Sequence, residues 1–344
     1  MRFFDAHCDT VIKVLDEGVD FRSDVHGAHV TLPGLQQAGV RAQVFACFVL
    51  SERHPGRERE RAVAMISAIR RMAEESRGAM RCVETCDGLP RRPEDPIAAI
   101  IGLEGADPLQ GDPEALRAFH ALGVRLLIPA WKDNAFSGTA FGSNSPLTAA
   151  GRDLVALAEE LGVVVDVSHL SDRAFDDVLR ICRRPIVASH SDCRALCPSP
   201  RNLTDPMIRA LADRGGVLGI NFYPGFLHAP FYEALERLRA ELRDVSPDLR
   251  DKRLRDWASC AERPPMSWIA RHATHAMDVG GEDCVGLGGD LDGVTSLPQG
   301  IDSVADYRKL PTALHDAGLS ARRVEKLCYG NFHRVFAELL PPSS

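Results

Sequence analysis

Short apolar runs alternate with longer amphipathic stretches along almost the whole chain. A short continuous apolar run is typical of a strand buried on both faces, whereas apolar positions three and four residues apart are typical of a helix. Their regular alternation indicates a parallel sheet whose strands are joined by crossover helices. The eight expected strands are residues 3–7, 42–50, 98–104, 124–131, 163–169, 185–190, 217–222 and 284–290.

The stretches between these runs carry helix start and stop signals. Asp112 and Asp205 each precede a proline, which places a capping carboxylate before proline at the first helical position. Gly123, Gly162 and Gly215 stand where a left-handed helix stop is expected. The expected helices are residues 58–77, 113–123, 146–162, 172–183, 205–216 and 266–280.

Eight strands with crossover helices favour a (β/α)8 TIM barrel over an open doubly wound sheet. The turns after the strands also lack the glycine-rich loops that bind dinucleotides or phosphates. We therefore expect residues 1–344 to form one α/β barrel domain. Residues 223–264, after strand 7, are too long for a simple loop, and this insertion is a candidate lid or subunit contact.

Composition and charge narrow the class of protein. Hydrophobic residues make up 45% and charged residues 26% of the chain, as in soluble globular proteins. The net charge of -7 offers no basic face for nucleic acid or anionic lipid. With no signal segment and no run of roughly 18 apolar residues, we expect a cytoplasmic protein without a membrane partner. The ten cysteines lack redox or zinc-finger spacing and are expected to be mainly buried.

Imidazoles and carboxylates close several of the expected strands, where the reacting groups of a barrel lie. His7 and Asp9 are two residues apart, so an extended strand directs both to one face, and they can hold one cation. His169 and His190 end neighbouring strands and can hold a second, with Glu104 between them as a bridging carboxylate. A lone histidine is usually structural, but histidines and carboxylates that stand together at so many strand ends indicate a metal site.

The last strand ends near Asp290, which we expect to act as the catalytic acid and base. Nitrogen and oxygen ligands without a thiolate suit two Zn²⁺ ions per chain, with Mn²⁺ or Co²⁺ as substitutes. Paired ions lower the pKa of a shared water and polarise a carbonyl, as amide hydrolysis requires. Asp290 then takes a proton from the water and returns it to the leaving nitrogen. Asp292 shares the same face of the strand and remains the alternative base.

Together these motifs resemble the membrane dipeptidase family, also called renal dipeptidases, of the metal-dependent amidohydrolase superfamily. The resemblance implies a barrel with a binuclear zinc centre built from the same five ligands. It also implies hydrolysis of dipeptides, including those with a C-terminal D-residue, and opening of β-lactam rings in some members. The motifs are residues 5–10, 101–105, 166–169, 189–191, 200–205, 216–222, 285–293 and 330–332.

The resemblance extends to substrate contacts. Arg201 lies in a family motif, and its guanidinium can bind a free C-terminal carboxylate through two hydrogen bonds, although an arginine in a polar loop is more often solvated. Trp131 takes the place of a histidine found in animal members, as the match at Asn134 indicates. Phe226 replaces an aromatic residue with a hydroxyl, which predicts an apolar wall.

We therefore expect a zinc dipeptidase for small dipeptides, with L-Xaa-D-Xaa among its substrates. The alternative within enzymes is another amidohydrolase reaction on the same centre, such as hydrolysis of an N-acyl amino acid or a lactam. A catalytically silent binding barrel is a further alternative, against which the complete ligand set argues. The side-chain preference and the oligomeric state, including a homodimer, stay open at this stage.

Overall fold

In the computed structural model, which describes residues 1–23 and 27–343, the strands form one sheet in which every pairing is parallel. The order along the sheet is β6-β5-β4-β2-β1-β9-β8-β7, with β3 pairing beside β4. All eight expected strands are present, and β3 is an addition. The strands are β1 Phe3–Cys8, β2 Val40–Phe48, β3 Met80–Cys82, β4 Ile97–Glu104, β5 Val124–Ile128, β6 Val164–Val165, β7 Val187–Ser191, β8 Val217–Ile220 and β9 Val285–Leu287.

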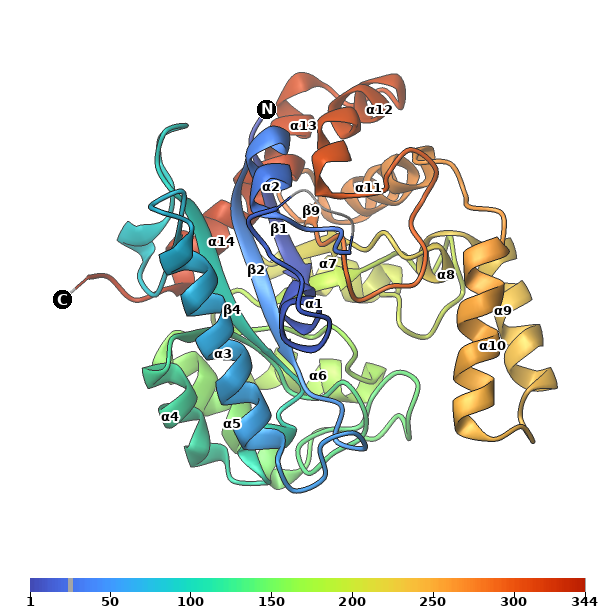
Figure 1. Cartoon of the computed structure of the whole chain (residues 1–344), viewed down its shortest axis with the longest axis horizontal. Helices are drawn as coiled ribbons and strands as arrows, with labels where there is room; N and C mark the ends of the chain where they lie inside the picture. The colour runs from blue at the N-terminus through green and yellow to red at the C-terminus, as the bar shows by residue number, and fades with distance from the viewer. Residues whose placement is uncertain (24–26, 344) are drawn as a thin grey trace.

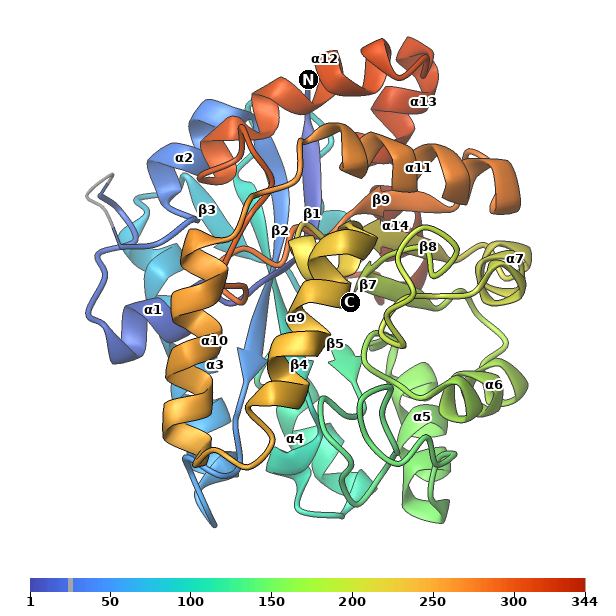
Figure 2. The same cartoon turned by 90° about the vertical axis from the view of Figure 1, so that its right-hand side faces the viewer.

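The sheet curls so that its two ends approach each other. Asp166, directly after β6, forms a parallel bridge with Val187 of β7. The backbone N–H of Val167 donates to the carbonyl of Val187 at 2.8 Å. Figures 1 and 2 show helices arranged around the outside of this curled sheet. The expected α/β class is confirmed.

The six expected helices correspond to α3 to α7 and α11. The helix expected at residues 113–123 begins with a 3₁₀ turn at Pro113–Ala115 and continues as α4. Within residues 1–23 and 27–343, no helix has both the length and the apolar character needed to cross a membrane. The helices are α1 Thr10–Asp16, α2 Leu32–Ala38, α3 Glu58–Glu75, α4 Leu116–Ala121, α5 Ala149–Leu161, α6 Asp172–Ile181, α7 Asp205–Asp213, α8 Pro224–Leu227, α9 Ala229–Glu241, α10 Pro247–Cys260, α11 Ser267–Gly280, α12 Leu310–Asp316, α13 Ala321–Glu325 and α14 Asn331–Leu339, with a π-helical turn at Lys326–Gly330.

One of the two expected capping carboxylates caps its helix. Asp112 accepts a hydrogen bond from the backbone N–H two residues on at 3.0 Å. At α7 the cap is Thr204, whose hydroxyl accepts from the N–H of Met207, so the expectation for Asp205 is wrong by one residue. Asp205 instead lies inside the first turn, where its carboxylate contacts His275 at 2.8 Å. The glycines expected to stop helices, Gly123, Gly162 and Gly215, all have positive φ.

The interior of the curled sheet is filled with apolar side chains at one end only. Phe4, Val44 and Ile100 point inward from β1, β2 and β4, and Phe332 of α14 packs on Phe4 with ring centroids 5.6 Å apart. A second, larger core lies between the outer face of the sheet and the helices. All ten cysteines are free thiols, and most are buried, as expected. Helix α14 thus covers the amino end of the sheet, opposite the carboxyl end at which His7, Glu104 and His190 lie.

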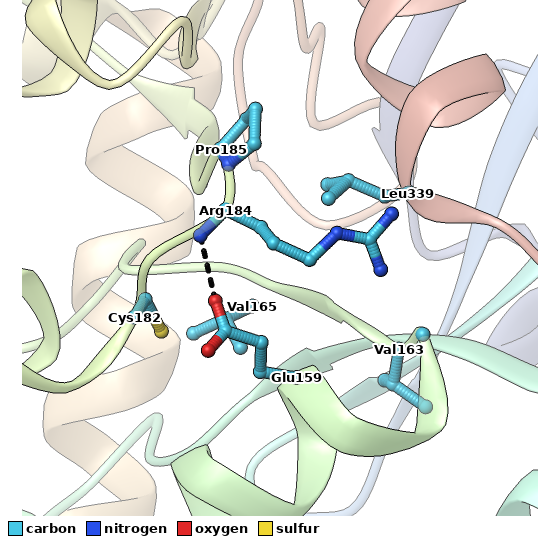
Figure 3. Close-up of a pocket in the computed structure, with 8 residues that line it drawn as sticks. Glu159, Val163, Val165, Cys182, Arg184, Pro185 and Leu339 are labelled. Carbon is cyan, nitrogen blue, oxygen red and sulfur yellow. Dashed lines mark hydrogen bonds between the residues drawn. The ribbon is translucent and has the colours of Figure 1, made fainter.

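A small pocket also lies at the amino end of β6 (Figure 3). Val163, Leu339 and the carboxylate of Glu159 line it, and this carboxylate accepts the backbone N–H groups of Arg183 and Arg184, each at 2.7 Å. Its volume of about 10 Å³ accommodates one water molecule at most. The pocket is therefore a packing feature rather than a ligand site.

Residues 223–264 fold into α8, α9 and α10. Phe231 of α9 and Trp257 of α10 pack together with ring centroids 4.9 Å apart. Figures 1 and 2 show α9 and α10 as neighbouring helices, and in Figure 1 they stand away from the helices that surround the sheet. Because the segment follows β8 directly, it begins at the carboxyl end of the sheet, where the polar residues lie.

Candidate metal centre and substrate site

Glu104, the last residue of β4, lies at the centre of a buried polar cluster. Its Oε2 is 3.2 Å from Nε2 of His7 on β1. Its Oε1 is 3.1 Å from Nε2 of His169, which follows β6, and 3.7 Å from Nε2 of His190 on β7. The two oxygens of one carboxylate thus face imidazoles from different strands. This is the arrangement that a bridging ligand requires.

Two further carboxylates approach the same nitrogen of His7. Nε2 of His7 is 3.4 Å from Oδ2 of Asp9 and 3.9 Å from Oδ1 of Asp290. Gly293 approaches both carboxylates so closely that a Cβ there would overlap Asp9 Oδ2 and lie 2.5 Å from Asp290 Oδ1. The structure therefore brings all five expected ligands and Asp290 together. Only glycine fits at position 293, beside the carboxylates of Asp9 and Asp290.

The unsatisfied groups in this cluster indicate that it fits a cation. Nε2 of His7 and Oδ1 of Asp9 are buried and have no hydrogen-bond partner among the described residues. Such buried orphan atoms are uncommon in folded proteins and require an explanation, such as an ion. Two sets of donors lie close enough to share an ion, namely His7 with Glu104 and His190, and His7 with Asp9 and Asp290. Nitrogen and carboxylate donors in this combination suit zinc and its neighbours.

Burial controls the protonation of the cluster. It lowers the pKa of His169 to about 3 and that of His190 well below its ordinary value, so burial favours the neutral form of both imidazoles. Burial also raises the pKa of Asp9 to about 6 and that of Asp290 to about 7, and neighbouring carboxylates add to both increases. Acidic groups crowded in this way favour a positive ion between them.

Other polar groups orient the members of the cluster. Ser189 Oγ lies 2.7 Å from Nδ1 of His190. Asn221, directly after β8, donates from Nδ2 to Oδ2 of Asp290 at 2.9 Å. The hydroxyl of Tyr307 donates to the buried carboxylate of Asp5 at 2.7 Å. Sequence reasoning assigned no role to Asn221 or Tyr307, although Asn221 follows the strand-end pattern that identified the other site residues.

Asp290 and Asp292, which the sequence alone left as alternatives, occupy different surroundings. The carboxylate of Asp292 accepts from the hydroxyl of Thr10 at 2.7 Å and from the backbone N–H of His29 at 2.6 Å. It also accepts from the backbone N–H of Val30 at 3.3 Å. The carboxylate of Asp292 therefore holds Thr10 and the segment at His29 in place, whereas that of Asp290 faces the cluster.

Three residues here have left-handed backbone, which side chains other than glycine rarely adopt. His169, Asp290 and Asp292 have φ values of 72°, 56° and 69°. His169 and Asp290 were expected at the ends of strands, but they lie in turns beyond β6 and β9. Each such conformation costs of order 1 kcal/mol or more. The turns direct these side chains back over the end of the sheet, which an uninterrupted strand would not do.

Arg201 lies beside the cluster and is 2% exposed. Its Nη1 donates to Ser191 Oγ at 2.5 Å and its Nη2 to the carbonyl of His190 at 2.8 Å, while its Nε has no partner among the described residues. Burial lowers its pKa to about 10, an effect that the charge of Asp290 and other carboxylates opposes. Arg201 is therefore a buried cation beside the cluster and not a solvated loop residue.

Trp131 and Phe226 flank this polar region with apolar surface. The ring of Trp131 lies 6.0 Å from that of His169 and 4.8 Å from that of Phe48 on β2. The guanidinium carbon of Arg201 lies 5.8 Å from the ring centroid of Phe226. Aromatic side chains therefore adjoin both the predicted ligands and the buried arginine.

The amide of Asn134 is engaged by its own loop and by Asp107, which follows β4. Its Nδ2 donates to the carbonyl of Pro129 at 3.0 Å and to Oδ2 of Asp107 at 3.2 Å. Its Oδ1 accepts the backbone N–H groups of Phe136 and Ser137 at 2.9 and 3.1 Å. These contacts hold the segment that carries Trp131.

Comparison with known proteins agrees with this geometry. Residues 1–340 match the family described as membrane dipeptidase, peptidase family M19. An uncharacterised Klebsiella pneumoniae protein encoded in the pqqA 5′ region is 35% identical over 279 residues, which cover 78% of this chain and 93% of that protein. Dipeptidase 3 of Macaca fascicularis is 28% identical over 94% of this chain, which spans only 60% of that relative. A metallo peptidase from Rhodobacter sphaeroides, solved with a phosphinate mimic of L-Ala-D-Ala, is 29% identical with a TM-score of 0.84 over 99% of both chains.

Proposed function

The chain belongs to the membrane dipeptidase family, peptidase family M19, and is thus a metallo-dipeptidase, and from this premise we propose that it hydrolyses small dipeptides, including L-Xaa-D-Xaa, at a centre of two zinc ions. The observation that carries the proposal is the position of Glu104, whose two oxygens face imidazoles from different strands. The similar Rhodobacter sphaeroides enzyme, solved with a mimic of L-Ala-D-Ala, supports the choice of substrate.

In this proposal, His7 and Asp9 would hold one ion, His169 and His190 would hold the other, and Glu104 would serve both. Mn²⁺ or Co²⁺ are suitable substitutes for zinc because the donors are nitrogen and oxygen atoms. When bound, the ions supply an activated water and polarise the scissile carbonyl. Ser189 orients His190 through its hydroxyl. Gly293 leaves room for the carboxylate of Asp9, because it has no side chain.

Asp290 moves the proton. Its Oδ2 accepts from Asn221, which fixes the carboxylate and leaves Oδ1 directed at the cluster, 3.9 Å from His7 Nε2. Oδ1 takes the proton of the attacking water and then delivers it to the leaving nitrogen of the dipeptide. Asn221 acts through Asp290 and is a positioning residue.

Arg201 binds the C-terminal carboxylate of the dipeptide, because its Nε is unpaired and its burial strengthens a contact between charges. Trp131 offers apolar surface beside His169, and Phe226 offers apolar surface beside Arg201. Asn134 contributes by holding the loop of Trp131 rather than by touching the substrate. We also propose that residues 1–344 form one closed (β/α)8 domain, with residues 223–264 as a lid or subunit contact.

Turnover by zinc-loaded protein tests the function. We expect the highest kcat/KM for L,L- or L,D-dipeptides and much lower values for N-acyl amino acids and lactams, which lack a free amino group. The matched panel is L-Ala-Gly, L-Ala-D-Ala, L-Ala-L-Ala and N-acetyl-Ala. A preference for N-acetyl-Ala would establish the alternative amidohydrolase reaction, and no dipeptide turnover at all would contradict the proposal.

The metal assignment predicts that Glu104→Ala lowers the content from about two ions per chain to one or fewer, since this residue would contact both ions. Elemental analysis after dialysis measures the content. His120→Ala is a matched control, because His120 lies on α4, outside the cluster, and its loss should leave the metal content unchanged. Full metal content in Glu104→Ala would contradict the bridging role.

A further inference from the structure

We propose that the dipeptide's C-terminal residue carries a large apolar side chain, which packs on an aromatic surface formed by Phe141, Tyr223 and Phe226. We call this surface the aromatic wall. The inference rests on the proposed function, because it uses Arg201 as the partner of the C-terminal carboxylate. It adds a side-chain preference, which neither the catalytic geometry nor the family relationship supplies.

The wall begins at the residue that would hold the carboxylate. Arg201 Cζ lies 5.8 Å from the ring centroid of Phe226. The ring of Phe226 stacks on that of Phe141 at 6.3 Å and 29°, and Tyr223 meets Phe226 edge-on at 5.0 Å and 81°. In a dipeptide, the C-terminal side chain branches from the carbon that bears the carboxylate. A carboxylate held by Arg201 therefore places that side chain beside these rings.

Phe141 is held in an exposed position by hydrogen bonds of its own loop. Its side chain is 53% exposed, and among the described residues few large hydrophobic side chains are so accessible. Asp133 fixes the loop on both sides of it, because its Oδ1 accepts from the N–H of Thr139 and its Oδ2 from that of Ser143, each at 2.7 Å. The ring of Phe141 extends the apolar surface that begins at Phe226 beside Arg201, and such a contiguous exposed apolar surface is typical of a ligand contact.

The charge around the wall favours an apolar partner over an acidic one. Arg239 of α9 lies with its guanidinium carbon 5.8 Å from the ring centroid of Phe141. Its Nη1 is paired with Glu236 Oε1 at 2.6 Å, so its charge is already balanced. The ion pair of Arg239 and Glu236 borders the aromatic wall, and the faces of the rings are the surface on which a substrate side chain can pack. Aromatic and branched aliphatic side chains bury the most area against such a surface.

The test compares kcat/KM for L-Ala-Phe, in both configurations at phenylalanine, with kcat/KM for L-Ala-Gly. We expect the wild-type protein to prefer the phenylalanine dipeptide of at least one configuration by about tenfold. Phe141→Ala should reduce this ratio about fivefold, chiefly through KM, and Phe141→Tyr should restore it. Phe226→Ala provides a second variant on the inner side of the wall.

Leu122→Ala is the matched control, because Leu122 is also exposed, at 38%, but lies at the end of α4. The ratio of kcat/KM for L-Ala-Phe to that for L-Ala-Gly should be the same in Leu122→Ala as in the wild-type protein. An unchanged ratio in both Phe141→Ala and Phe226→Ala, or a wild-type preference for L-Ala-Gly or L-Ala-Glu, would overturn the inference while leaving the proposed function intact. Absence of turnover for every dipeptide would contradict the proposed function, and the inference would fall with it.

Discussion

Replacing Asp290 by asparagine is expected to lower kcat by roughly 10²-fold or more, while the metal content and the fold remain. Asparagine keeps the shape of the side chain and can still contact Asn221, but it cannot accept the proton of the attacking water at Oδ1. Steady-state kinetics on L-Ala-D-Ala, with elemental analysis of the same preparation, measures both quantities. A variant with wild-type kcat would remove Asp290 from the reaction.

Asp292→Asn is the matched control, two residues away. The carboxylate of Asp292 accepts hydrogen bonds from Thr10 and His29, so its loss should lower the free energy of unfolding by about 1–3 kcal/mol. At a temperature where the variant is folded, kcat should stay within a few fold of the wild-type value. If Asp292→Asn lost kcat and Asp290→Asn did not, the base would be the other carboxylate.

Arg201→Met is expected to lower kcat/KM for a dipeptide by roughly ten- to a hundredfold, because a charged hydrogen bond in a buried site contributes about 1.5–3 kcal/mol. The same variant should have little selective effect on the corresponding C-terminal amide, which offers the guanidinium no anion. The measured quantity is the ratio of kcat/KM for L-Ala-D-Ala to that for its amide.

This ratio also controls for damage to the protein. Arg201 is buried near Asp166 and Asp192, whose carboxylates lose a compensating cation in the variant. Such damage depresses the acid and the amide together and cancels in the ratio. Arg201→Lys should recover only part of the selectivity, since an ammonium group does not form the forked contact. Equal losses for acid and amide would show that Arg201 does not bind the carboxylate.

The strands and most of the site could be predicted from sequence for one physical reason. A strand buried on both faces is an apolar run, so a polar residue at its end is conspicuous. His7, Glu104 and His190 were found in this way, and all three lie in the observed strands. His169 and Asp290 were found by the same rule although they lie in left-handed turns, because the rule depends only on their order along the chain.

Other features depend on contacts between distant segments and leave little local pattern. Tyr307 donates to Asp5 across 302 positions, and nothing near either residue indicates the other. Helices α12, α13 and α14 follow the last expected strand and were not assigned, although α14 closes the amino end of the sheet. The wall that joins Phe141 to Phe226 is formed by a loop and the short helix α8, which only the folded sheet brings together.

The pairing of β1 with β9 has a consequence for how the protein matures on the ribosome. Asp5 pairs with Leu287, and Thr10 bonds Asp292 across 282 positions. In a nascent chain that has not yet exposed β9, His7, Asp9 and Glu104 lack their neighbour Asp290. The sheet around the centre we propose is therefore completed only after β9 has left the ribosome, which makes the pairing of β1 with β9 a late step of folding during synthesis.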